Sequence, residues 1–244
     1  MAASKKKESN APVVYSQRVQ NIINFIELLY VPSGDGQGGT FKLMDFQKEF
    51  INDVYGPVDE NGKRIVRRAI LSMGRKNGKT MMVACLSLVH LWGPEKVMNG
   101  ENYSVANDRD QASIVFRYAC QIVRADPELS AAIQITESTK TMIALDTMSV
   151  YRAVSSEAGT KMGLSPSFVS YDELAQSKNR ELYDAFDTSM GARYEPLFIT
   201  ISTQSPDPQH PLSILIDQGL SKQIPSTYCK LYAVPDDAEG IFDN

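Results

Sequence analysis

Residues 72–80, SMGRKNGKT, have the residue types and spacing of a phosphate-binding loop. Such a loop joins a buried strand to the start of a helix and points its backbone N–H groups at an anion. Gly78 lets the backbone approach a phosphate closely, Lys79 can reach the β- and γ-phosphates, and the Thr80 hydroxyl can ligate Mg²⁺. The predicted nucleotide-binding residues of this loop are Gly74, Arg75, Lys76, Asn77, Gly78, Lys79 and Thr80.

The loop departs from the G-x-x-x-x-G-K-[ST] pattern in one place, because Met73 occupies the first glycine position. The alternative interpretation is an incidental basic turn on the surface. The apolar strand expected before the loop and the apolar helix expected after it are the context that a phosphate-binding loop requires. The sequence therefore favours an ATP site here.

A second signal is the segment FVSYDE at 168–173, in which a buried strand ends in two adjacent acids. Asp172 is expected to hold the Mg²⁺ shell with Thr80, and Glu173 to orient and deprotonate the attacking water. An acidic helix start is the alternative, since acids favour helix N-termini. With the phosphate-binding loop upstream, the catalytic interpretation becomes the better one.

Two weaker signals complete the predicted site. Thr203 and Gln204 follow the strand expected at 197–202, where ligands bind in open α/β sheets, and either side chain could sense the γ-phosphate. Gln47, about 25 residues before the loop, could donate to and accept from the edge of adenine. The alternatives are a polar strand end entering a Pro-rich loop, and an exposed Gln on a helix that buries Phe46.

Helices and strands that alternate along the chain must position these residues. Hydrophobic spacing predicts helices over 14–30, 44–54, 79–92, 110–124, 179–190 and 212–220. Strands are expected at 65–72, 103–106, 168–171, 197–202 and 227–234, with a hairpin of strands at 141–145 and 149–154. This alternation predicts an α/β fold whose mostly parallel central sheet is flanked by helices. At least one strand, at 103–106, separates the two motifs, which fits the additional-strand, catalytic-glutamate (ASCE) branch of P-loop ATPases.

Composition excludes several other classes. The net charge of −4 argues against coating nucleic acid by bulk charge, and much of the basic surplus in the first 80 residues falls on the phosphate-binding loop and the strand before it. No stretch approaches 18 uncharged apolar residues, so no membrane span is expected. The start, MAASKKKESN, lacks the apolar core of a secretory signal. Scattered cysteines (Cys85, Cys120, Cys229) and two isolated histidines (His90, His210) predict neither a metal site nor a catalytic triad.

Taken in order, Phe46-Gln47, GRKNGKT, FVSYDE and ISTQ resemble the large terminase subunit of tailed bacteriophages over roughly residues 40–205. Arg75 fits the Arg that this family carries in its loop, and the family tolerates the change at Met73. The resemblance implies an ATPase motor that threads double-stranded viral DNA into a procapsid. The implied domains are a disordered tail at 1–12, an ATPase domain with an N-terminal helical segment at 13–225, and a final strand and linker toward an absent nuclease domain at 226–244.

The resemblance also implies partners and an arginine donated by a neighbouring subunit. The expected partners are the portal protein, the small terminase subunit and further copies of the chain in a ring, by resemblance a pentamer. The expected location is the cytoplasm of the infected bacterium and, transiently, the procapsid. Arg75 could contact the γ-phosphate in cis. Candidates for the arginine supplied in trans are Arg152 and Arg193, with Lys161 as a third basic candidate.

Two other functions stay open from sequence. One is a P-loop helicase or translocase of another kind. It would need its own DNA-engaging motifs between the phosphate-binding loop at 72–80 and the FVSYDE segment at 168–173. The other is a nucleotide-switched assembly module without significant hydrolysis. The pair Asp172-Glu173 argues against a switch, which has no need of the second acid.

Overall fold

The structure is a computed structural model that describes residues 14–34, 36–75, 77–155 and 163–232, without the side chain of Arg109. Lys76, Lys161, the predicted tail at 1–12 and residues 233–244 of the predicted linker lie outside the described residues. The helices are α1 (Gln17–Leu28), α2 (Asp45–Tyr55), α3 (Lys79–Leu91), α4 (Arg109–Ala125), α5 (Pro127–Ala132), α7 (Glu181–Ser189) and α8 (Pro211–Leu220). Short 3₁₀ turns lie at η1 (Leu174–Gln176) and η2 (Met190–Ala192). The strands are β1 (Arg68–Ser72), β2 (Glu101–Ala106), β3 (Ile133–Thr136), β4 (Thr141–Ala144), β5 (Ser149–Ser155), β6 (Phe168–Asp172), β7 (Leu197–Ser202) and β8 (Thr227–Leu231).

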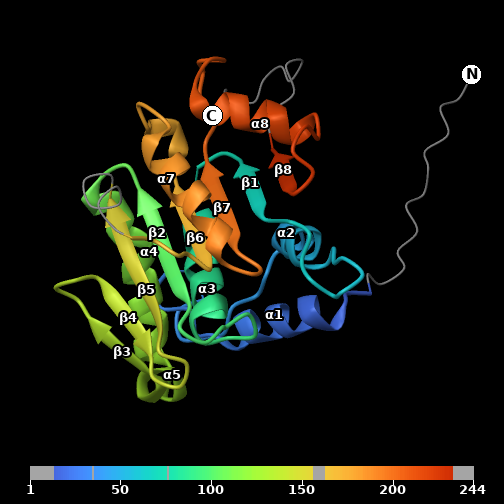
Figure 1. The fold of residues 1–244 in the computed structure, drawn as a ribbon. Helices are drawn as coiled ribbons and strands as arrows, with labels where there is room; N and C mark the ends of the chain where they lie inside the picture. Colours follow the sequence, from blue (N-terminus) through green and yellow to red (C-terminus); the bar gives the residue numbers. More distant parts are fainter. Residues whose placement is uncertain (1–13, 35, 76, 156–162, 233–244) are drawn as a thin grey trace, which may run out of the picture.

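These strands form an eight-stranded sheet in the order β3-β4-β5-β2-β6-β7-β1-β8 (Figure 1). Strands β5, β2, β6, β7, β1 and β8 pair in parallel, which confirms the predicted parallel sheet. Antiparallel β3 and β4 extend it at one edge, so the sheet is mixed, and the predicted hairpin is β4–β5. Strand β8, the predicted final strand, pairs in parallel with β1 and forms one edge of this sheet.

The additional strand is not the one that its place in the sequence suggested. Strand β7 lies between β1, which carries the phosphate-binding loop, and β6, which carries the two acids. Strand β2, at the position of the strand expected at 103–106, lies on the other side of β6. The chain order of strands does not fix their lateral order, because each helical crossover can pass over a neighbour.

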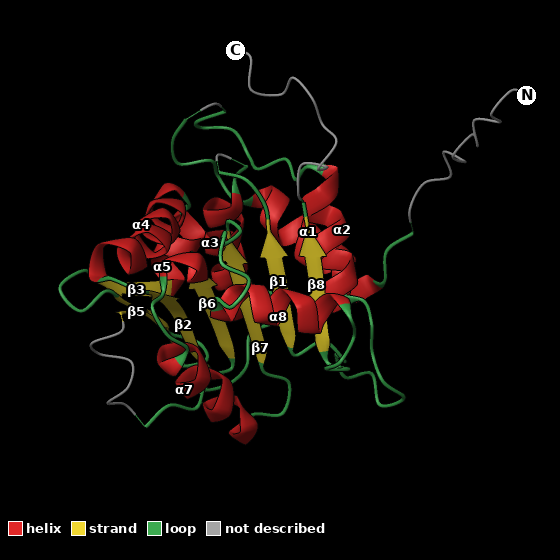
Figure 2. Ribbon diagram, turned by 90° about the horizontal axis from the view of Figure 1, so that it is seen from above, coloured by secondary structure: helices red, strands yellow, loops and turns green. Residues whose placement is uncertain are grey.

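Helices cover both faces of the sheet, and each face has its own core (Figure 2). Helices α1–α5 pack against one face in a core that includes Leu71, Ile199 and Ile201. Helices α7 and α8 pack against the other in a core that includes Ile70, Val169 and Phe198. Every residue of β6 and β7 is buried, as expected for central strands of a parallel sheet.

The largest departure from the predicted elements lies between α4 and the hairpin. Asp126-Pro127 was expected only to end a helix, but Asp126 also caps a new one by accepting from Glu128 N (2.9 Å) and Leu129 N (3.1 Å). Proline suits the first turn of a helix because the N–H it lacks has no partner there. The short helix α5 leads directly into β3, and both are too short to show a hydrophobic period.

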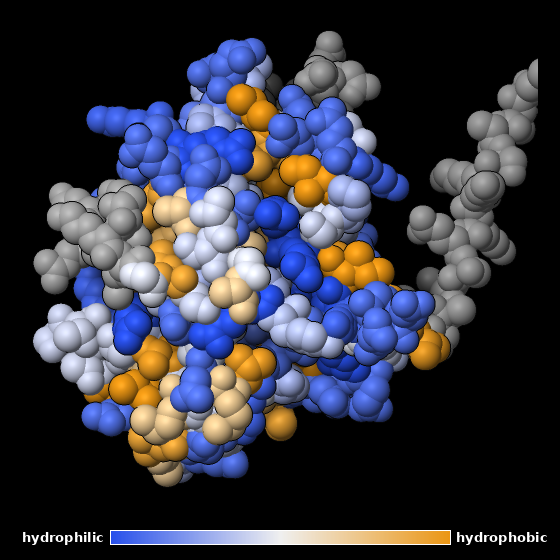
Figure 3. Space-filling view, in the orientation of Figure 1, coloured by the Kyte–Doolittle hydropathy of each residue, from blue (hydrophilic) through white to orange (hydrophobic). Residues whose placement is uncertain are grey.

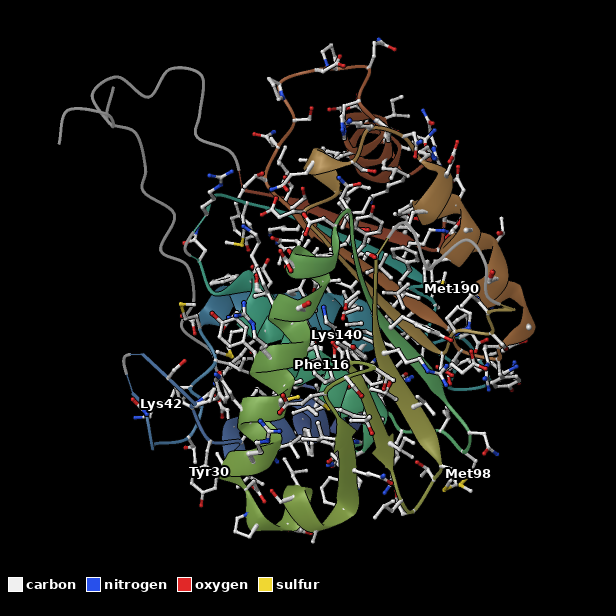
Figure 4. All side chains as sticks on the ribbon, turned by 90° about the vertical axis from the view of Figure 1, so that its left-hand side faces the viewer. Tyr30, Lys42, Met98, Phe116, Lys140 and Met190 are labelled. Carbon is white, nitrogen blue, oxygen red and sulfur yellow. The ribbon has the colours of Figure 1, made fainter. Side chains whose placement is uncertain are left out.

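The surface is mostly hydrophilic in Figure 3, and apolar side chains gather on the part of this face where Figure 1 shows β3, β4 and α5. Figure 4 looks onto the adjoining side, where Lys140 of the β3–β4 turn lies beside α4 and donates to Ser113. The described helices include none with the length and apolar character needed to cross a bilayer.

Candidate active site

The predicted phosphate-binding loop joins β1 to α3, as its sequence context required. Gly78 is the N-cap residue of α3 and has a left-handed backbone (φ 70°, ψ 13°) that glycine adopts without strain. No side chain among the described residues caps α3, so its first N–H groups remain available to an anion. The start of α3, which follows the buried strand β1, can therefore bind a phosphate through these N–H groups.

The Lys79 ammonium is folded back onto its own loop. It donates to Met73 O (2.8 Å) and Gly74 O (2.6 Å), and Asn77 Nδ2 donates to Gly74 O (3.2 Å). Burial lowers the pKa of Lys79, although the nearby carboxylates of Glu173 and Asp172 act in the opposite direction. An ammonium in this position can exchange the two carbonyls for phosphate oxygens.

Met73, the one departure from the loop pattern, has a structural explanation. Its side chain is buried in the same core as Leu71 and Ile199, and its backbone N donates to Ser202 O (3.1 Å). The residue therefore acts as a continuation of β1. The glycine that the pattern expects lies one position later, at Gly74, whose surroundings leave room for a Cβ: the nearest atom would be Asn77 Nδ2 at 3.5 Å.

The two acids at the end of β6 have different environments. Asp172 is 2% exposed, and the Thr80 hydroxyl donates to its Oδ2 across 3.4 Å. Burial, reinforced by the neighbouring Glu173 carboxylate, raises the pKa of Asp172 to about 6. Asp172 therefore carries a carboxylate whose charged form would be stabilised by a cation beside Thr80.

Glu173 is a non-glycine residue with a left-handed backbone (φ 55°, ψ 52°). Such a conformation costs about 1–3 kcal/mol and persists where the surroundings enforce it. Here Glu173 N donates to Ile201 O (2.8 Å), and its Oε2 accepts from both Thr203 N (3.1 Å) and Thr203 Oγ1 (3.1 Å). Strand β7 thus fixes the backbone of Glu173, and Thr203, the residue after β7, fixes its carboxylate.

A cavity of about 410 Å³ lies at the edge of the sheet where β1, β6 and β7 end, which we call the carboxyl edge; Glu173 lines it, and Asp172 does not. Its lining comprises Arg75, Asn77, Gly78, Lys79, Thr80, Met81, Gln111, Tyr118, Glu173 and Gln176. Sequence reasoning missed Met81, Gln111, Tyr118 and Gln176. Of these four, only Gln111 had a local signal, because it stands three residues after the helix-capping Asp108.

The remaining predicted nucleotide ligands lie around this cavity without lining it. Gln47 is buried on α2, and its Oε1 accepts from Met44 N (2.9 Å), so one lone pair serves its own helix. A Cβ placed on Gly78 would lie 3.7 Å from Gln47 Nε2, which brings the amide donor beside the loop. Thr203 is half-buried against Glu173, and Gln204 is exposed.

The basic candidates are spread over the molecule. Arg75 is exposed and lines the cavity. Arg152 is half-buried on β5, paired across from Tyr103 of β2. Arg193 lies before β7, at the opposite edge of the sheet, where its Nε donates to Ser165 O (2.7 Å) and its Nη2 to Asn99 O (3.2 Å). Lys161 lies outside the described residues.

The donor set at the carboxyl edge fits a magnesium ion that arrives with a nucleotide. Thr80 and Asp172 offer a hydroxyl and a carboxylate oxygen, the hard ligands that Mg²⁺ prefers. Over the described ranges, no group of three or more His, Cys, Asp or Glu side chains could hold a metal without further ligands. A cation here would depend on phosphate oxygens and water for the rest of its shell.

A phosphate-binding loop after β1, an inserted strand β7 and a glutamate directly after the buried aspartate of β6 define the ASCE class of P-loop NTPases. Comparison with known proteins narrows the class. Residues 45–212 match the family described as the terminase large subunit, ATPase domain. The chain is 40% identical over 226 residues to the terminase large subunit of Enterobacteria phage HK97, covering 91% of this chain and 44% of the relative. The chain therefore belongs to the family of terminase large-subunit ATPase domains, and a nucleotide-binding site is implied by that membership.

Solved structures agree with this assignment. The crystal structure of the HK97 bacteriophage large terminase superimposes with a TM-score of 0.82 at 40% identity, over 91% of this chain and 45% of that chain. A mutant of the large terminase ATPase domain from Thermus phage P74-26 shares the fold, with a TM-score of 0.57 at 16% identity over 79% of this chain and 87% of that chain. The chain thus spans less than half the length of the HK97 protein.

Proposed function

We propose that this chain is the motor domain of a viral terminase, hydrolysing ATP to move double-stranded DNA into a procapsid. The observation that carries the proposal is the placement of Glu173 on the wall of the cavity that Lys79 and Thr80 also line. A nucleotide switch needs the last two residues but has no use for a carboxylate fixed beside them. Family membership supplies the biological setting.

In the proposed mechanism, the open start of α3 and the loop N–H groups of residues 74–78 bind the phosphates of ATP. Lys79 leaves the carbonyls of Met73 and Gly74 for phosphate oxygens, and Arg75 reaches the γ-phosphate from the cavity rim. Lys76 and Asn77 belong to the same loop. Gln47 donates its amide N–H to adenine while its oxygen caps α2. Thr203 and Gln204 lie where the end of β7 can respond to the γ-phosphate.

Thr80 and Asp172 are the residues that would hold Mg²⁺. Magnesium, when bound, supplies positive charge to the β- and γ-phosphate oxygens. Glu173 accepts a proton from the attacking water, with its carboxylate oriented by Thr203. Among the described residues, both hydrogen bonds to the Glu173 carboxylate fall on Oε2, so Oε1 is the oxygen that we assign to the attacking water.

A neighbouring subunit of a homo-oligomeric ring would complete the site with an arginine. Arg152 and Arg193 are the described candidates, and the existing bonds of Arg193 to two carbonyls would have to break before it could serve. Mixing subunits that carry Lys79→Ala with subunits that carry Arg152→Ala or Arg193→Ala tests each candidate. A candidate is excluded if its alanine variant hydrolyses ATP normally in assembled rings.

The proposed partners follow from the family: double-stranded viral DNA, the portal protein, the small terminase subunit and other copies of the chain, by family resemblance five in a ring. The proposed place of action is the host cytoplasm and, transiently, the procapsid. ATP and Mg²⁺ are the proposed cofactors.

The test is steady-state ATP hydrolysis by the full-length protein, with and without DNA and portal-bearing procapsids. Hydrolysis stimulated by both, and abolished by Lys79→Ala, is the expected result. Lys42→Ala, which removes an exposed lysine far from the loop in sequence, is the matched control and should hydrolyse normally. ATP binding without hydrolysis under all conditions would favour a nucleotide switch, and strand separation without procapsids would favour a helicase.

A further inference from the structure

Helix α8 begins with an uncommon capping residue. His210 is its N-cap, and His210 Nδ1 accepts from Leu212 N (3.1 Å). Ser, Thr, Asp and Asn are preferred at N-caps, where a short side chain accepts from the first N–H groups of the helix. An imidazole can accept in the same way with one nitrogen, and it carries a second nitrogen on the far side of its ring. A histidine cap can therefore join its helix to another part of the fold.

The second nitrogen, His210 Nε2, lies 2.9 Å from Ser177 O, four residues after Glu173. The two contacts together fix the tautomer of the ring. Leu212 N–H can only donate, so Nδ1 is the acceptor and the proton of the neutral ring lies on Nε2. Nε2–H then donates to the Ser177 carbonyl, which can only accept. One neutral imidazole thus bonds the start of α8 to Ser177.

Ser177 ends a short segment, residues 173–177, that we call the glutamate turn. Glu173 begins this turn with a left-handed backbone, and both Glu173 and Gln176 line the cavity. Gln176 N donates to Glu173 O (3.0 Å). Ser177 N donates to Leu174 O (3.0 Å). These bonds shape the turn internally, so its placement relative to the sheet depends on bonds to other elements.

The first half of the glutamate turn is held by strand β7. Glu173 N donates to Ile201 O (2.8 Å). Ala175 N donates to Ser202 Oγ (3.0 Å). Both acceptors belong to a strand whose residues are all buried, so this half of the turn has a rigid support.

The second half of the turn is held from two sides. Asn107, which follows β2, donates from its Nδ2 to Gln176 O across 3.3 Å at an exposed position. The bond from His210 to Ser177 O is shorter, at 2.9 Å, and is partly buried. It also comes from a helix that is anchored in the core through Leu212, Leu215 and Ile216. Helix α8 is therefore the firmer of the two supports.

We propose that His210 is a positioning residue for ATP hydrolysis, which holds the glutamate turn in place through its bond to Ser177 O. The inference rests on the proposed function, because it needs Glu173 as the proton acceptor. A left-handed glutamate persists only where its surroundings enforce it, so a loosened turn releases Glu173 from the orientation that hydrolysis needs. Misplacing a reacting group by about 1 Å can cost about 10²-fold in rate.

Substitution can separate the cap of α8 from the bond to Ser177. Serine is a preferred N-cap but has one short hydroxyl, so His210→Ser keeps the cap and removes the bond to Ser177. For the full-length protein with DNA and portal-bearing procapsids, we expect kcat to fall about tenfold, with KM within about twofold of wild type. Amide hydrogen exchange over residues 174–178 should become about fivefold faster. The unfolding temperature should stay at the wild-type value, because α8 remains capped.

Three further variants serve as controls. His210→Ala removes the cap as well, so it should show the same loss of kcat together with a lower unfolding temperature. Ser16→Ala removes the N-cap of α1, whose side chain accepts from Val19 N (3.3 Å), and should lower the unfolding temperature without changing kcat. Gln209→Ala, at the exposed position beside His210, should match wild type in every measurement.

Four results would overturn the inference. Unchanged hydrogen exchange over residues 174–178 in His210→Ser would mean that the turn does not depend on His210. Faster exchange with a wild-type kcat would mean that the position of the turn does not affect hydrolysis. A higher KM with unchanged kcat would place the effect on nucleotide binding. A lower unfolding temperature in His210→Ser, with kcat falling equally in Ser16→Ala, would mean a structural role. If wild type hydrolyses no ATP, the proposed function fails and the inference falls with it, which the wild-type measurement shows before any variant is made.

Discussion

The two ends of helix α3 lie at opposite edges of the same sheet and differ in how their polar groups are satisfied. At the carboxyl edge, the Lys79 ammonium donates to two carbonyls of its own loop, and the Thr80 hydroxyl donates to Asp172 across 3.4 Å. At the other end, His90 is buried, and its Nε2 is hydrogen-bonded to Tyr55 OH (2.9 Å). Its ring stacks on Phe168, with 4.2 Å between the ring centroids. The first end presents groups to a ligand. At the second, which we call the closed end, polar groups bond to one another beside a smaller cavity of about 190 Å³ that His90 helps to line.

The closed end is surrounded by a network that we call the amino-edge network, formed by Arg18, Tyr55, Arg64, His90, Glu95 and Glu195. Arg18 Nε donates to Glu95 Oε1 (2.8 Å) and its Nη1 to Glu195 Oε1 (3.0 Å). Arg64 is buried and donates to the carbonyls of Val66, Glu195 and Pro196. The carboxyl edge thus holds a strained glutamate beside a buried aspartate, whereas the amino-edge network pairs Arg18 with two carboxylates and Arg64 with three carbonyls.

The largest expected effect is that of Glu173→Gln at the carboxyl edge, which should change activity and leave stability unchanged. Losing the proton acceptor should lower kcat for ATP by about 10²–10⁴-fold. Stability should not fall, because the amide can still accept from Thr203 and no longer repels the Asp172 carboxylate. Steady-state hydrolysis and thermal unfolding of the same preparation check both halves, with the exposed Glu60→Gln as control. A variant that keeps more than a tenth of the wild-type rate would remove Glu173 from its role.

The opposite result is expected for Arg64→Ala in the amino-edge network, which should lower stability and leave activity unchanged. Removing the guanidinium leaves the carbonyls of Val66, Glu195 and Pro196 without their donor. Buried acceptors left unpaired cost about 1–3 kcal/mol each, so the free energy of unfolding should fall by about 3 kcal/mol. The kcat per folded molecule should stay unchanged. Chemical denaturation is the measurement, and Arg67→Ala, at an exposed neighbouring position, is the matched control. Equal losses in both variants would contradict the role given to Arg64.

The carboxyl edge was predictable from sequence to the extent that its residues belong to local patterns. Residues 74–80 and the pair Asp172-Glu173 are contiguous, and each follows a strand whose hydrophobicity marks it. Gln111 and Tyr118 were not found, because they reach the cavity from α4, whose helical period signals burial without saying which site its edge approaches. The insertion of β7 beside β1 escaped for the same reason, since it is a property of the whole sheet.

The amino-edge network was invisible to sequence reasoning. His90 was expected to be a structural residue, which its buried stack on Phe168 agrees with, but its partner Tyr55 is 35 positions away. Arg64 bonds to carbonyls more than 130 positions along the chain. Such pairings depend on the packing of α1, α3 and the start of β7, and no spacing rule encodes them.

Within the carboxyl edge, Thr203→Val tests whether Thr203 orients Glu173 or contacts the nucleotide. The variant keeps the backbone N–H that donates to Glu173 Oε2 and loses the hydroxyl that donates to the same oxygen, both at 3.1 Å. A net hydrogen bond to a charged group contributes about 1.5 kcal/mol, so kcat should fall about tenfold with KM unchanged. Thr203→Ser restores the donor and should restore the rate. A rise in KM with unchanged kcat would instead place Thr203 on the nucleotide, as a γ-phosphate sensor.

The smallest expected effect lies in the pH dependence of stability at the amino edge. Burial, with the positive charges of Arg64 and Arg18 nearby, lowers the pKa of His90 well below its ordinary value. A histidine of ordinary pKa, about 6.5, takes up a proton in the unfolded chain before it does so in the fold. The unfolded state therefore binds more protons below that pH, and stability present above it is lost as pH falls. Between pH 6.5 and 5.5 this single group should lower the free energy of unfolding by about 1 kcal/mol.

His90→Phe, which keeps the aromatic stack on Phe168, should show a smaller loss of the free energy of unfolding over that interval. Equal slopes in wild type and variant would mean that His90 does not control acid stability, and that the closed end of α3 is stabilised without it.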